Sequence, residues 1–462
     1  VDTTVPTLTA VAIASNNAAT TRAKVGNTVT VTFTASAPSS PASYRCARRS
    51  VRCGSHGFSP CGGFKLWAMS APMKTYDVVI VGGGVVGSAS AHYLRKNGFT
   101  GSIALVEKDT SWARGCTALS VGGLRQQFST PENIHLSKFG VTLVKNLKQE
   151  FGPDADIGFK EQGYLICATP EGLPILEENR AVQIANGADN VLLRGDELAA
   201  RFPWLVTEGI AAGCFGLSGE GWVDPYMFAA LFRKSAIAKG VELIQDEVTG
   251  VSRDGDRITG VTLASGETMS CGTLVNAAGT GAGKLAAMAG IELPVGPRKR
   301  YVYVLDCPAA TEALHKAPLT VIPGGVYFRP EGRNFLAGLS PEEHQEPDNL
   351  DWEVDHAWFE ENIWPALAER IPLFEAIKVI SAWVGHYDYN ALDQNAVIGP
   401  HPEVTNFLFA NGFSGHGLQQ GPAAGNAISE LVIDGRYKTI DLTRFGFDRI
   451  RNNQPLFEKN VI

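Results

Sequence analysis

The sequence of 462 residues predicts an α/β fold with two sheets, one in a domain of alternating strands and helices and one in an inserted antiparallel domain. The first observation is an apolar run at 77–81 that leads into a glycine-rich turn and a helical pattern ending near Asn97. The second is the period-2 alternation in 298–306, 324–340 and 378–389, which is typical of antiparallel strands. The third is a composition typical of globular α/β proteins, with 44% hydrophobic residues and 50 glycines.

Residues 1–72 form an extension that does not belong to this fold. "TLTAVAIAS" and "NTVTVTFTAS" alternate Thr with small or β-branched residues, which predicts paired strands. They resemble the opening strands of a bacterial immunoglobulin-like domain, but too few strands follow to close a sandwich. We expect a cytoplasmic location. The alternative is a mitochondrial one, if the tract is a transit peptide, because it is also rich in Arg and Ser and poor in acids. We expect natural starts at Met69 or Met73, with the functional protein beginning near Lys74.

Charge and cysteine content exclude several classes of function. Residues 1–72 carry seven basic residues and one acid, a net charge of +6, which leaves −13 on the rest because the total is −7. A body this acidic excludes nucleic acid as a partner, since phosphate binding requires a basic face. No apolar run approaches about 18 residues, so no transmembrane segment is predicted. The cysteines after residue 72 form no CxxC pair or Cys/His cluster, which predicts reduced thiols and no metal site.

The turn after the first strand has the G-x-G-x-x-G spacing of dinucleotide-binding domains. Gly82 allows the tight turn, Gly84 lets the backbone approach a pyrophosphate, and Gly87 lets the helix pack closely on the strand. The helix N-terminus then directs its amides and its dipole at the phosphates. Glu107 lies 20 residues after Gly87, where an acid binds a ribose 2′-hydroxyl and repels a 2′-phosphate. The motif therefore disfavours NADP but leaves NAD and FAD open.

Three further segments indicate how the chain passes along the cofactor. Residues 111–129 are a long Gly/Ser loop directly after the acid. Residues 241–283 contain strands separated by two turns and end in an apolar strand, which predicts a three-stranded meander that returns to the dinucleotide domain. Residues 406–435 predict a strand, a Gly/Ser/His loop and a helix whose N-terminus points at the ligand.

With these segments the chain resembles the D-amino acid oxidase/sarcosine oxidase (DAO) family of FAD enzymes, and within it the sarcosine oxidase β-subunit-like and dimethylglycine dehydrogenase-like proteins. The matching motifs run in order over about residues 73–440: the Gly82–Glu107 motif, "GCT", "GWVDP", "VNAAG", "VYFRP", "DQNAVIG" and "GFSGHG". The resemblance implies a glutathione-reductase-type FAD-binding Rossmann domain with an inserted antiparallel-sheet substrate domain. The expected FAD-binding domain comprises 73–155, 205–292 and 388–462, and the expected substrate domain comprises 156–204 and 293–387.

The resemblance also implies which residues hold FAD. The glycine turn lies under the pyrophosphate, and other residues contact the adenosine, the ribose and the phosphates. The loop before the last helix passes beside the isoalloxazine, where its amides stabilise the negative charge that builds at N1–C2=O on reduction. The implied residues are Gly82, Gly84, Gly87, Glu107, Lys108, Cys116, Thr117, Val248, Ala278, Gly279, Gly412, Ser414, Gly415, His416, Gly417 and Leu418.

Two departures from the family pattern predict noncovalent FAD. Relatives that attach FAD through histidine have a "GSTWH" pattern, and Leu119 stands at the position of that histidine. Relatives that attach it through cysteine need one around residues 385–387, and "VGHYDY" has none. His386 is the alternative attachment point in that segment.

The antiparallel sheet is expected to roof the flavin and line the substrate cavity. Arg329 is the first candidate for binding a substrate carboxylate, because a guanidinium pairs with a carboxylate in bidentate fashion. Arg125 is the second candidate, and Tyr301 and Tyr327 supply walls. Gln419 replaces a lysine that helps to bind the carboxylate in monomeric sarcosine oxidases, so sarcosine itself is not the expected substrate.

Two residues have open catalytic roles. His416 is either a base or a loop residue whose flanking glycines are the important feature. Lys299 is the candidate for the lysine that oxidases of the family place near flavin N5. The sequence leaves open whether O2 or an electron carrier accepts the electrons.

We expect the chain to oxidise the C–N bond of an amino acid, either a secondary (N-alkyl) or a D-amino acid. Hydride moves to flavin N5, and the resulting imine hydrolyses. One alternative is a 2-hydroxy-acid dehydrogenase on the same scaffold. The other is a non-catalytic assembly flavoprotein, because the "LSVGGLRQQFS" loop resembles FAD-dependent oxidoreductase proteins associated with mitochondrial complex I assembly.

Overall fold

The computed structural model describes residues 8–15, 28–35, 50–52, 74–346 and 350–459, in two compact units that divide between Ala71 and Pro72. In the first unit, the strands pair antiparallel in the order β1-β2-β3, as the Thr/Val alternation predicts. Their bounds are β1 (Leu8–Ser15), β2 (Thr28–Ala35) and β3 (Ser50–Arg52). Met69 and Met73, the expected natural starts, lie outside the described residues.

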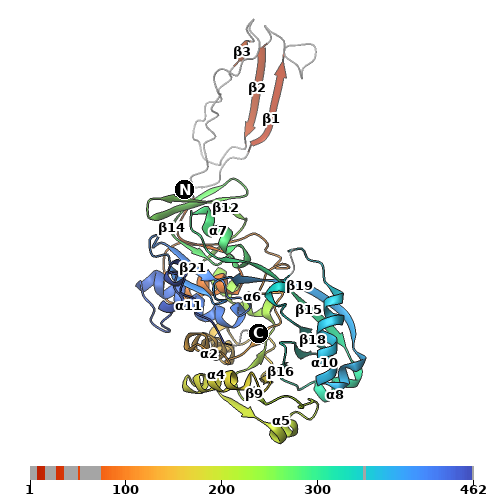
Figure 1. Cartoon of the computed structure of the whole chain (residues 1–462). Helices are drawn as coiled ribbons and strands as arrows, with labels where there is room; N and C mark the ends of the chain where they lie inside the picture. The colour runs from red at the N-terminus through yellow and green to blue at the C-terminus, as the bar shows by residue number, and fades with distance from the viewer. Residues whose placement is uncertain (1–7, 16–27, 36–49, 53–73, 347–349, 460–462) are drawn as a thin grey trace. The chain divides into compact units, whose positions relative to one another are not determined.

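The first sheet of the second unit contains the predicted parallel strands (Figure 1). Neighbours pair parallel in the order β11-β5-β4-β14, and β21 pairs parallel with the end of β14. The β12–β13 hairpin pairs with the beginning of β14 and completes the predicted meander. The bounds are β4 (Lys74–Val81), β5 (Ile103–Glu107), β11 (Glu242–Gln245), β12 (Val248–Asp254), β13 (Arg257–Leu263), β14 (Thr268–Asn276), β20 (Val397–Pro400) and β21 (Phe407–Asn411).

Helices cover both faces of this sheet and bury its apolar side chains. On one face Leu94 of α1, Ala236 of α6 and Ile428 of α11 pack on the parallel strands, and on the other face Leu285 of α7 packs on the meander. Helix α1 contacts both α6 and α11, so the three lie side by side. The bounds are α1 (Val85–Lys96), α2 (Pro131–Lys145), α3 (Leu147–Phe151), α6 (Pro225–Ala238), α7 (Ala282–Met288), α11 (Gly417–Asp434) and α12 (Asp448–Arg451).

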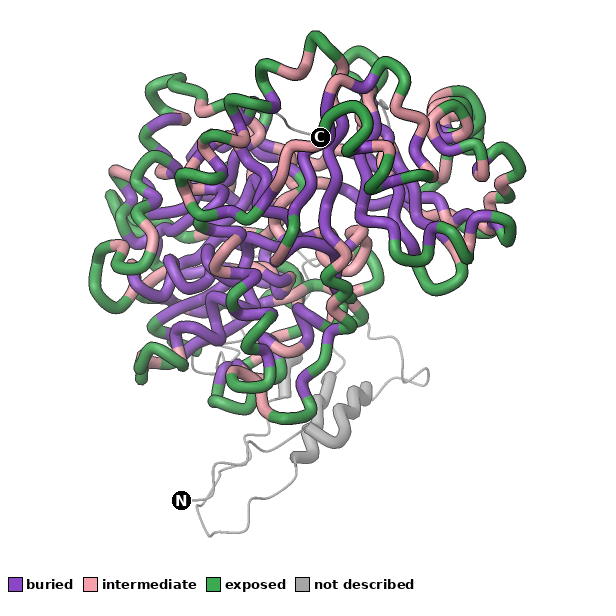
Figure 2. Tube along the Cα trace, turned by 90° about the horizontal axis from the view of Figure 1, so that it is seen from below, coloured by how far each residue is buried: buried purple, intermediate pink, exposed green. Residues whose placement is uncertain are grey.

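The second sheet is the predicted inserted sheet, in the order β19-β15-β18-β17-β16-β7-β9-β8, with β16 and β7 as its one parallel pair among the described residues. Buried Phe328, Phe335 and Phe374 pack with Leu314 of α8 and Leu367 of α10 to form its core. Figure 2 shows that buried residues follow the interior strands of the second unit while its outer loops are exposed. The strands are β7 (Tyr164–Ala168), β8 (Asn190–Leu193), β9 (Ala212–Gly216), β15 (Val295–Asp306), β16 (Leu319–Val321), β17 (Tyr327–Glu331), β18 (Asn334–Gly338) and β19 (Lys378–Asn390).

Strand β9 belongs to this second sheet, although the sequence division put residues 205–292 in the first domain. Its sequence, AGCFG, is short and buried throughout, so it has no period-2 alternation to mark it as part of the antiparallel sheet. The β6–β10 pair (Gly123–Leu124 with Gly221–Trp222) lies outside both large sheets. The remaining helices are α4 (Leu173–Ala185), α5 (Gly195–Arg201), α8 (Pro308–Leu314), α9 (His356–Trp358) and α10 (Trp364–Arg370). Among the described residues, no helix is long and apolar enough to cross a membrane.

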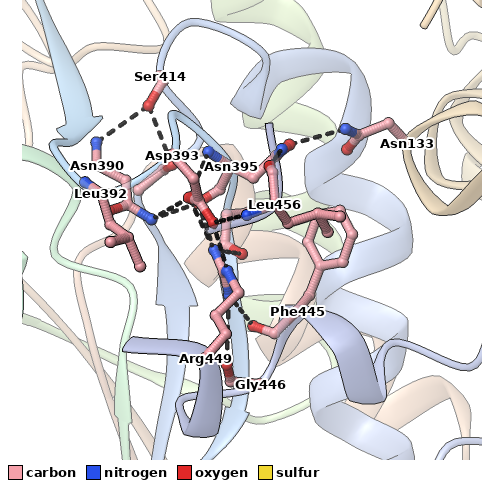
Figure 3. Close-up of polar contacts among 12 residues, drawn as sticks. Asn133, Asn390, Leu392, Asp393, Asn395, Ser414, Phe445, Gly446, Arg449 and Leu456 are labelled. Atoms are coloured by element: carbon pink, nitrogen blue, oxygen red, sulfur yellow. Dashed lines mark hydrogen bonds and ion pairs between the residues drawn. The ribbon is translucent and has the colours of Figure 1, made fainter. Parts of the chain in front are cut away.

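A buried polar network fastens the C-terminal segment and the loop before α11 onto the first domain (Figure 3). Asp393 and Arg449 form its ion pair, with 2.8 Å between Nε and Oδ2, and both side chains are almost fully buried. Asp393 also accepts hydrogen bonds from the Asn390 side chain and the Leu456 amide. The Asn390 amide donates to the Ser414 hydroxyl, so the network reaches the loop expected beside the flavin.

We predict that Arg449→Gln lowers the free energy of unfolding by about 3–5 kcal/mol, because it leaves the buried Asp393 carboxylate without its cation. The matched control is Arg451→Gln, which removes exposed ion pairs and should cost less than about 1 kcal/mol. Denaturant unfolding of both variants measures the two values. A cost for Arg449→Gln no larger than that of the control contradicts the prediction.

Candidate active site

A cavity of about 310 Å³ lies at the carboxyl ends of β4, β5 and β14, where α1 and α11 begin. In an open α/β sheet this is the edge at which ligands bind. The predicted cofactor residues that line the cavity are Gly82, Gly84, Glu107, Lys108, Cys116, Thr117, Val248, Ala278, Gly279, Gly415, Gly417 and Leu418. Among the described residues, no group of three or more His, Cys, Asp or Glu side chains is arranged to hold a metal.

The glycine turn has the close contacts that its motif predicts. A Cβ on Gly82 would lie 2.2 Å from the Ala277 carbonyl oxygen, and one on Gly87 would lie 1.8 Å from the Gly82 carbonyl oxygen. Any larger side chain would therefore push α1 away from β4. Gly87 does this packing and does not line the cavity. The Val85 amide, at the first turn of α1, donates to the Thr117 hydroxyl at 3.1 Å.

Glu107 lies at the N-terminus of α1, as its spacing from the glycines predicts. Its carboxylate accepts hydrogen bonds from the Gly83 amide at 2.8 Å and from the Asp109 amide at 2.9 Å. These two bonds fix the carboxylate at the cavity wall and leave acceptor positions for ribose hydroxyls, since a carboxylate accepts about four hydrogen bonds.

Asp388 of β19 is a half-buried acid in the cavity wall that the sequence analysis missed. Its Oδ2 accepts the amides of Gly412 and Phe413 at 2.9 and 3.1 Å, and burial raises the pKa of this carboxyl to about 6. The Gly412 amide, expected to face the isoalloxazine, instead holds the loop to β19. Gly412 and Ser414 do not line the cavity. No spacing rule links Asp388 to the loop 24 residues later, so the sequence offered no signal for this contact.

Arg125 and His416 lie together beside the start of α11. Arg125 Nη2 is 3.1 Å from His416 Nε2, and the Arg125 amide donates to Gln419 Oε1 at 2.6 Å. The Arg125 guanidinium also donates to the Gln127 carbonyl and stacks on Phe128. Burial and the Arg125 charge lower the pKa of His416 to about 3, so the imidazole is neutral and its Nε2 accepts from Arg125. Neither His416 nor Arg125 lines the main cavity.

Arg329, the first candidate for the carboxylate, is bound to protein groups. Its Nε donates to the Val121 carbonyl at 2.8 Å, and its Nη1 donates to the Pro330 carbonyl and to the Glu331 carboxylate. It also lies over the Trp222 ring and is absent from the cavity lining.

The other substrate-side candidates also lie outside the cavity lining, namely Lys299, His386, Tyr301, Tyr327 and Gln419. Lys299 Nζ pairs with Asp351 at 2.6 Å, and the His386 ring packs against Trp352 at 4.5 Å. Tyr301 is buried in the core of the second domain. Lys299 and His386 are opposite each other in the β15–β19 register. Adjacent residues of a strand face opposite sides of a sheet, so Tyr387, which does line the cavity, lies on the other face from His386.

Three tyrosines from different strands of the second sheet, buried Tyr164 and the half-buried Tyr327 and Tyr387, form a polar group at the cavity wall, which Tyr387 lines. Electrostatic interactions link Tyr164 of β7, Tyr327 of β17 and Tyr387 of β19. Tyr164 also interacts electrostatically with Arg125. Burial raises the pKa of all three, that of Tyr164 to about 12. Within residues 74–346 and 350–459, their hydroxyls have no hydrogen-bond partner. This group brings together two predicted residues, Arg125 and Tyr327, and two that the sequence analysis missed.

A family model described as "DAO: FAD dependent oxidoreductase" matches residues 77–431. The chain belongs to this family. It is 43% identical over 429 residues to "FAD-dependent oxidoreductase domain-containing protein 1" of Xenopus laevis, which covers 85% of this chain and 86% of that protein. At lower identity it is similar to the sarcosine oxidase β subunit of an Arthrobacter species, 28% over 80% of this chain and 90% of that one. Rat mitochondrial dimethylglycine dehydrogenase is 26% identical over 78% of this chain, but over only 43% of its own length.

A solved DAO-type structure has the same fold. The L-proline dehydrogenase of P. horikoshii superposes with a TM-score of 0.73 at 26% identity, covering 84% of this chain and 100% of that one. The expected family, the FAD cofactor and the α/β fold are thereby confirmed. The chain is an FAD-dependent oxidoreductase of the DAO family.

The cavity fits FAD on its own chemistry. Two helix N-termini and the glycine turn supply amides for the pyrophosphate, Glu107 supplies acceptors for a ribose, and Tyr387 and Leu418 supply walls at the start of α11. Leu119 lies next to Gly385, the first residue of the other attachment segment, because a Cβ on Gly385 would lie 3.5 Å from the Leu119 Cβ. Neither residue offers a nucleophile, and His386 lies on the face of β19 opposite to Tyr387, which lines the cavity. Burial and the Asp388 charge raise the pKa of the nearby Cys116 thiol to about 12, so it stays protonated.

We predict that acid precipitation releases all the FAD into the supernatant, because Leu119 replaces the linking histidine, residues 385–387 contain no cysteine, and His386 lies on the face of β19 opposite to the cavity-lining Tyr387. Absorbance of the supernatant and the pellet measures the distribution. Yellow colour that stays with the pellet contradicts the prediction, and a Cys116→Ala variant then tests whether this thiol forms the bond.

Proposed function

We propose that this oxidoreductase oxidises the C–N bond of an amino acid, either a secondary (N-alkyl) or a D-amino acid. The observation that carries the proposal is the group of buried Arg125 and Tyr164 with half-buried Tyr327 and Tyr387 beside the cavity. A buried cation and unpaired hydroxyls next to a flavin site match the carboxylate and the amine of an amino acid.

Each part of this group has a stated role in the proposal. FAD, when bound, supplies the hydride acceptor at N5. Arg125 keeps donors beyond those it gives to Gln127 and His416, and these bind the substrate carboxylate. The tyrosine hydroxyls hydrogen-bond the substrate, and their rings exclude water, which favours the neutral amine. Loss of the hydride and of the N–H proton leaves an imine, and water hydrolyses it.

His416 and Gln419 act on Arg125 in this proposal and do not touch the substrate. The neutral imidazole accepts from the guanidinium, so Nε2 is occupied and is not free to act as a base. Gln419 accepts the Arg125 amide, which fixes the backbone that carries the guanidinium. Both residues are therefore positioning residues.

The names of two similar proteins support an N-alkyl amino acid as the substrate. Sarcosine and L-proline, which appear in the names of an Arthrobacter relative and of the P. horikoshii dehydrogenase, are both amino acids with a secondary amine. The bound Arg329 and the absence of a lysine at Gln419 separate this site from the monomeric sarcosine oxidase pattern, so we propose an N-alkyl substrate other than sarcosine.

We predict that anaerobic addition of a suitable N-alkyl or D-amino acid bleaches the flavin band near about 450 nm, since the reduced flavin loses this absorbance. The panel includes L-proline, other N-alkyl amino acids, D-amino acids and matched 2-hydroxy acids. Bleaching by hydroxy acids but not by amines supports a 2-hydroxy-acid dehydrogenase instead. No bleaching by any compound supports the non-catalytic assembly flavoprotein.

We predict that Arg125→Lys lowers kcat/KM for the best amino acid by at least about tenfold, because the bidentate geometry is lost while the charge remains. Arg329→Lys is a matched control, since both arginines are 4% exposed. It should lower the unfolding midpoint and leave kcat/KM within about twofold, because its bonds go to protein groups. If instead Arg329→Lys lowers kcat/KM and Arg125→Lys does not, Arg329 is the residue that binds the substrate carboxylate. A decarboxylated analogue should lose little in either variant.

A further inference from the structure

Trp112 lies over the glycine turn in an unusual backbone conformation. Its φ is +63°, a left-handed value that a bulky residue adopts only at a cost in strain. The edge of its indole occupies the space beside Gly83, where a Cβ would be 2.6 Å from Cη2. Gly83 is not one of the three glycines of the dinucleotide motif. The absence of a side chain there is explained by the indole that rests on it.

Arg233 of α6 holds Trp112 from the other side. The guanidinium carbon lies 3.7 Å from the indole ring centre, and the Arg233 side chain is more than nine-tenths buried at 7% exposure. Trp112 and Arg233 both line the cavity, next to Glu107. The strained tryptophan and the arginine on its ring therefore form one wall of the cofactor site.

Arg233 has no hydrogen bond or ion pair within residues 74–346 and 350–459. Tyr226 and Glu107 interact with it electrostatically, and the Glu107 carboxylate accepts hydrogen bonds from the Gly83 and Asp109 amides. The Arg233 nitrogens are not among the fully buried polar atoms that lack a partner, so they are open to the cavity that Arg233 lines, and a guanidinium has five N–H donors to offer a ligand there. Because Arg233 faces the cavity, the acceptors it lacks are those of a ligand bound there.

We propose that Arg233 and Trp112 form a clamp on the AMP half of FAD, in which Trp112 covers the cofactor and Arg233 donates to its oxygen or nitrogen acceptors. The clamp lies beside Glu107, since a Cβ on Gly83 would meet both Trp112 and the Glu107 side chain, and Glu107 is expected at the adenosine end of the site. If FAD is held noncovalently, as predicted above, contacts of this kind set how long it stays bound. The inference rests on the FAD cofactor and is independent of the proposed substrate.

The test is the rate at which FAD leaves the holoenzyme, followed by the rise in fluorescence of free FAD. Arg233→Gln and Trp112→Gly should each raise this rate at least about tenfold, since hydrogen bonds to a charged group and a cation–π contact are lost. The double variant should exceed the faster single variant by less than the product of the two effects, because the side chains act as a pair. Lys234→Gln, which removes an exposed charge from the same helix, is the matched control and should change the rate by less than about twofold.

Binding of ADP and of FMN, which represent the two halves of FAD, tests which part of the cofactor the clamp contacts. ADP binding to the apoprotein should weaken in Arg233→Gln by the same factor as FAD binding, while FMN binding should not change. Weaker FMN binding with unchanged ADP binding, or an FAD release rate within about twofold of wild type, overturns the proposal. If Arg233→Gln does not fold, Arg233→Lys keeps the charge but loses the planar stack, and release no faster than wild type in that variant equally overturns it.

Discussion

The site depends on how closely α1 approaches the sheet. The contacts of Gly87 with the Gly82 carbonyl and of Gly82 with Ala277 set α1 directly on β4 and β14. Helix α11 then packs along α1, with Gly421 against Val85 and Gly425 against Ala89, so the N-termini of both helices reach the same cavity. Two positive helix ends on one cavity favour an anionic ligand. An enlarged side chain at any of these contacts would separate the helices and disperse the amides that bind the cofactor.

The cofactor half of the site was predictable because its signal is local. The glycines and Glu107 lie within one strand–helix–strand unit, so sequence spacing alone places them together. The substrate half depends on which face of a strand each residue takes. In β19 His386 and Tyr387 are neighbours, yet only Tyr387 lines the cavity, and in β15 Lys299 lies on the side of His386. The alternation of aromatic and charged residues predicted the strands, but it did not predict which face of the sheet lies toward the flavin.

Buried arginines show a second limit of sequence reasoning. Arg125, Arg233 and Arg329 are all almost fully buried, and sequence alone gives no difference between them. Their roles separate only when their acceptors are known, because carbonyl and carboxylate partners come from remote parts of the chain. Arg329 donates to carbonyl and carboxylate groups of the protein, and Arg125 donates to one carbonyl and to His416. Arg233 has no hydrogen-bond acceptor within the described residues. The number of donors left over is a better guide to ligand contact than position in a motif.

The polar network around Asp393 also bears on how the protein is made. Leu456 donates to Asp393, and Glu458 accepts hydrogen bonds from Ser129 and Thr130 at the start of α2. Residues from the last part of the chain thus complete a domain that begins near residue 74. These contacts join segments that the ribosome makes far apart in time. They cannot close the cofactor domain until the segment around residues 449–458 has been synthesised.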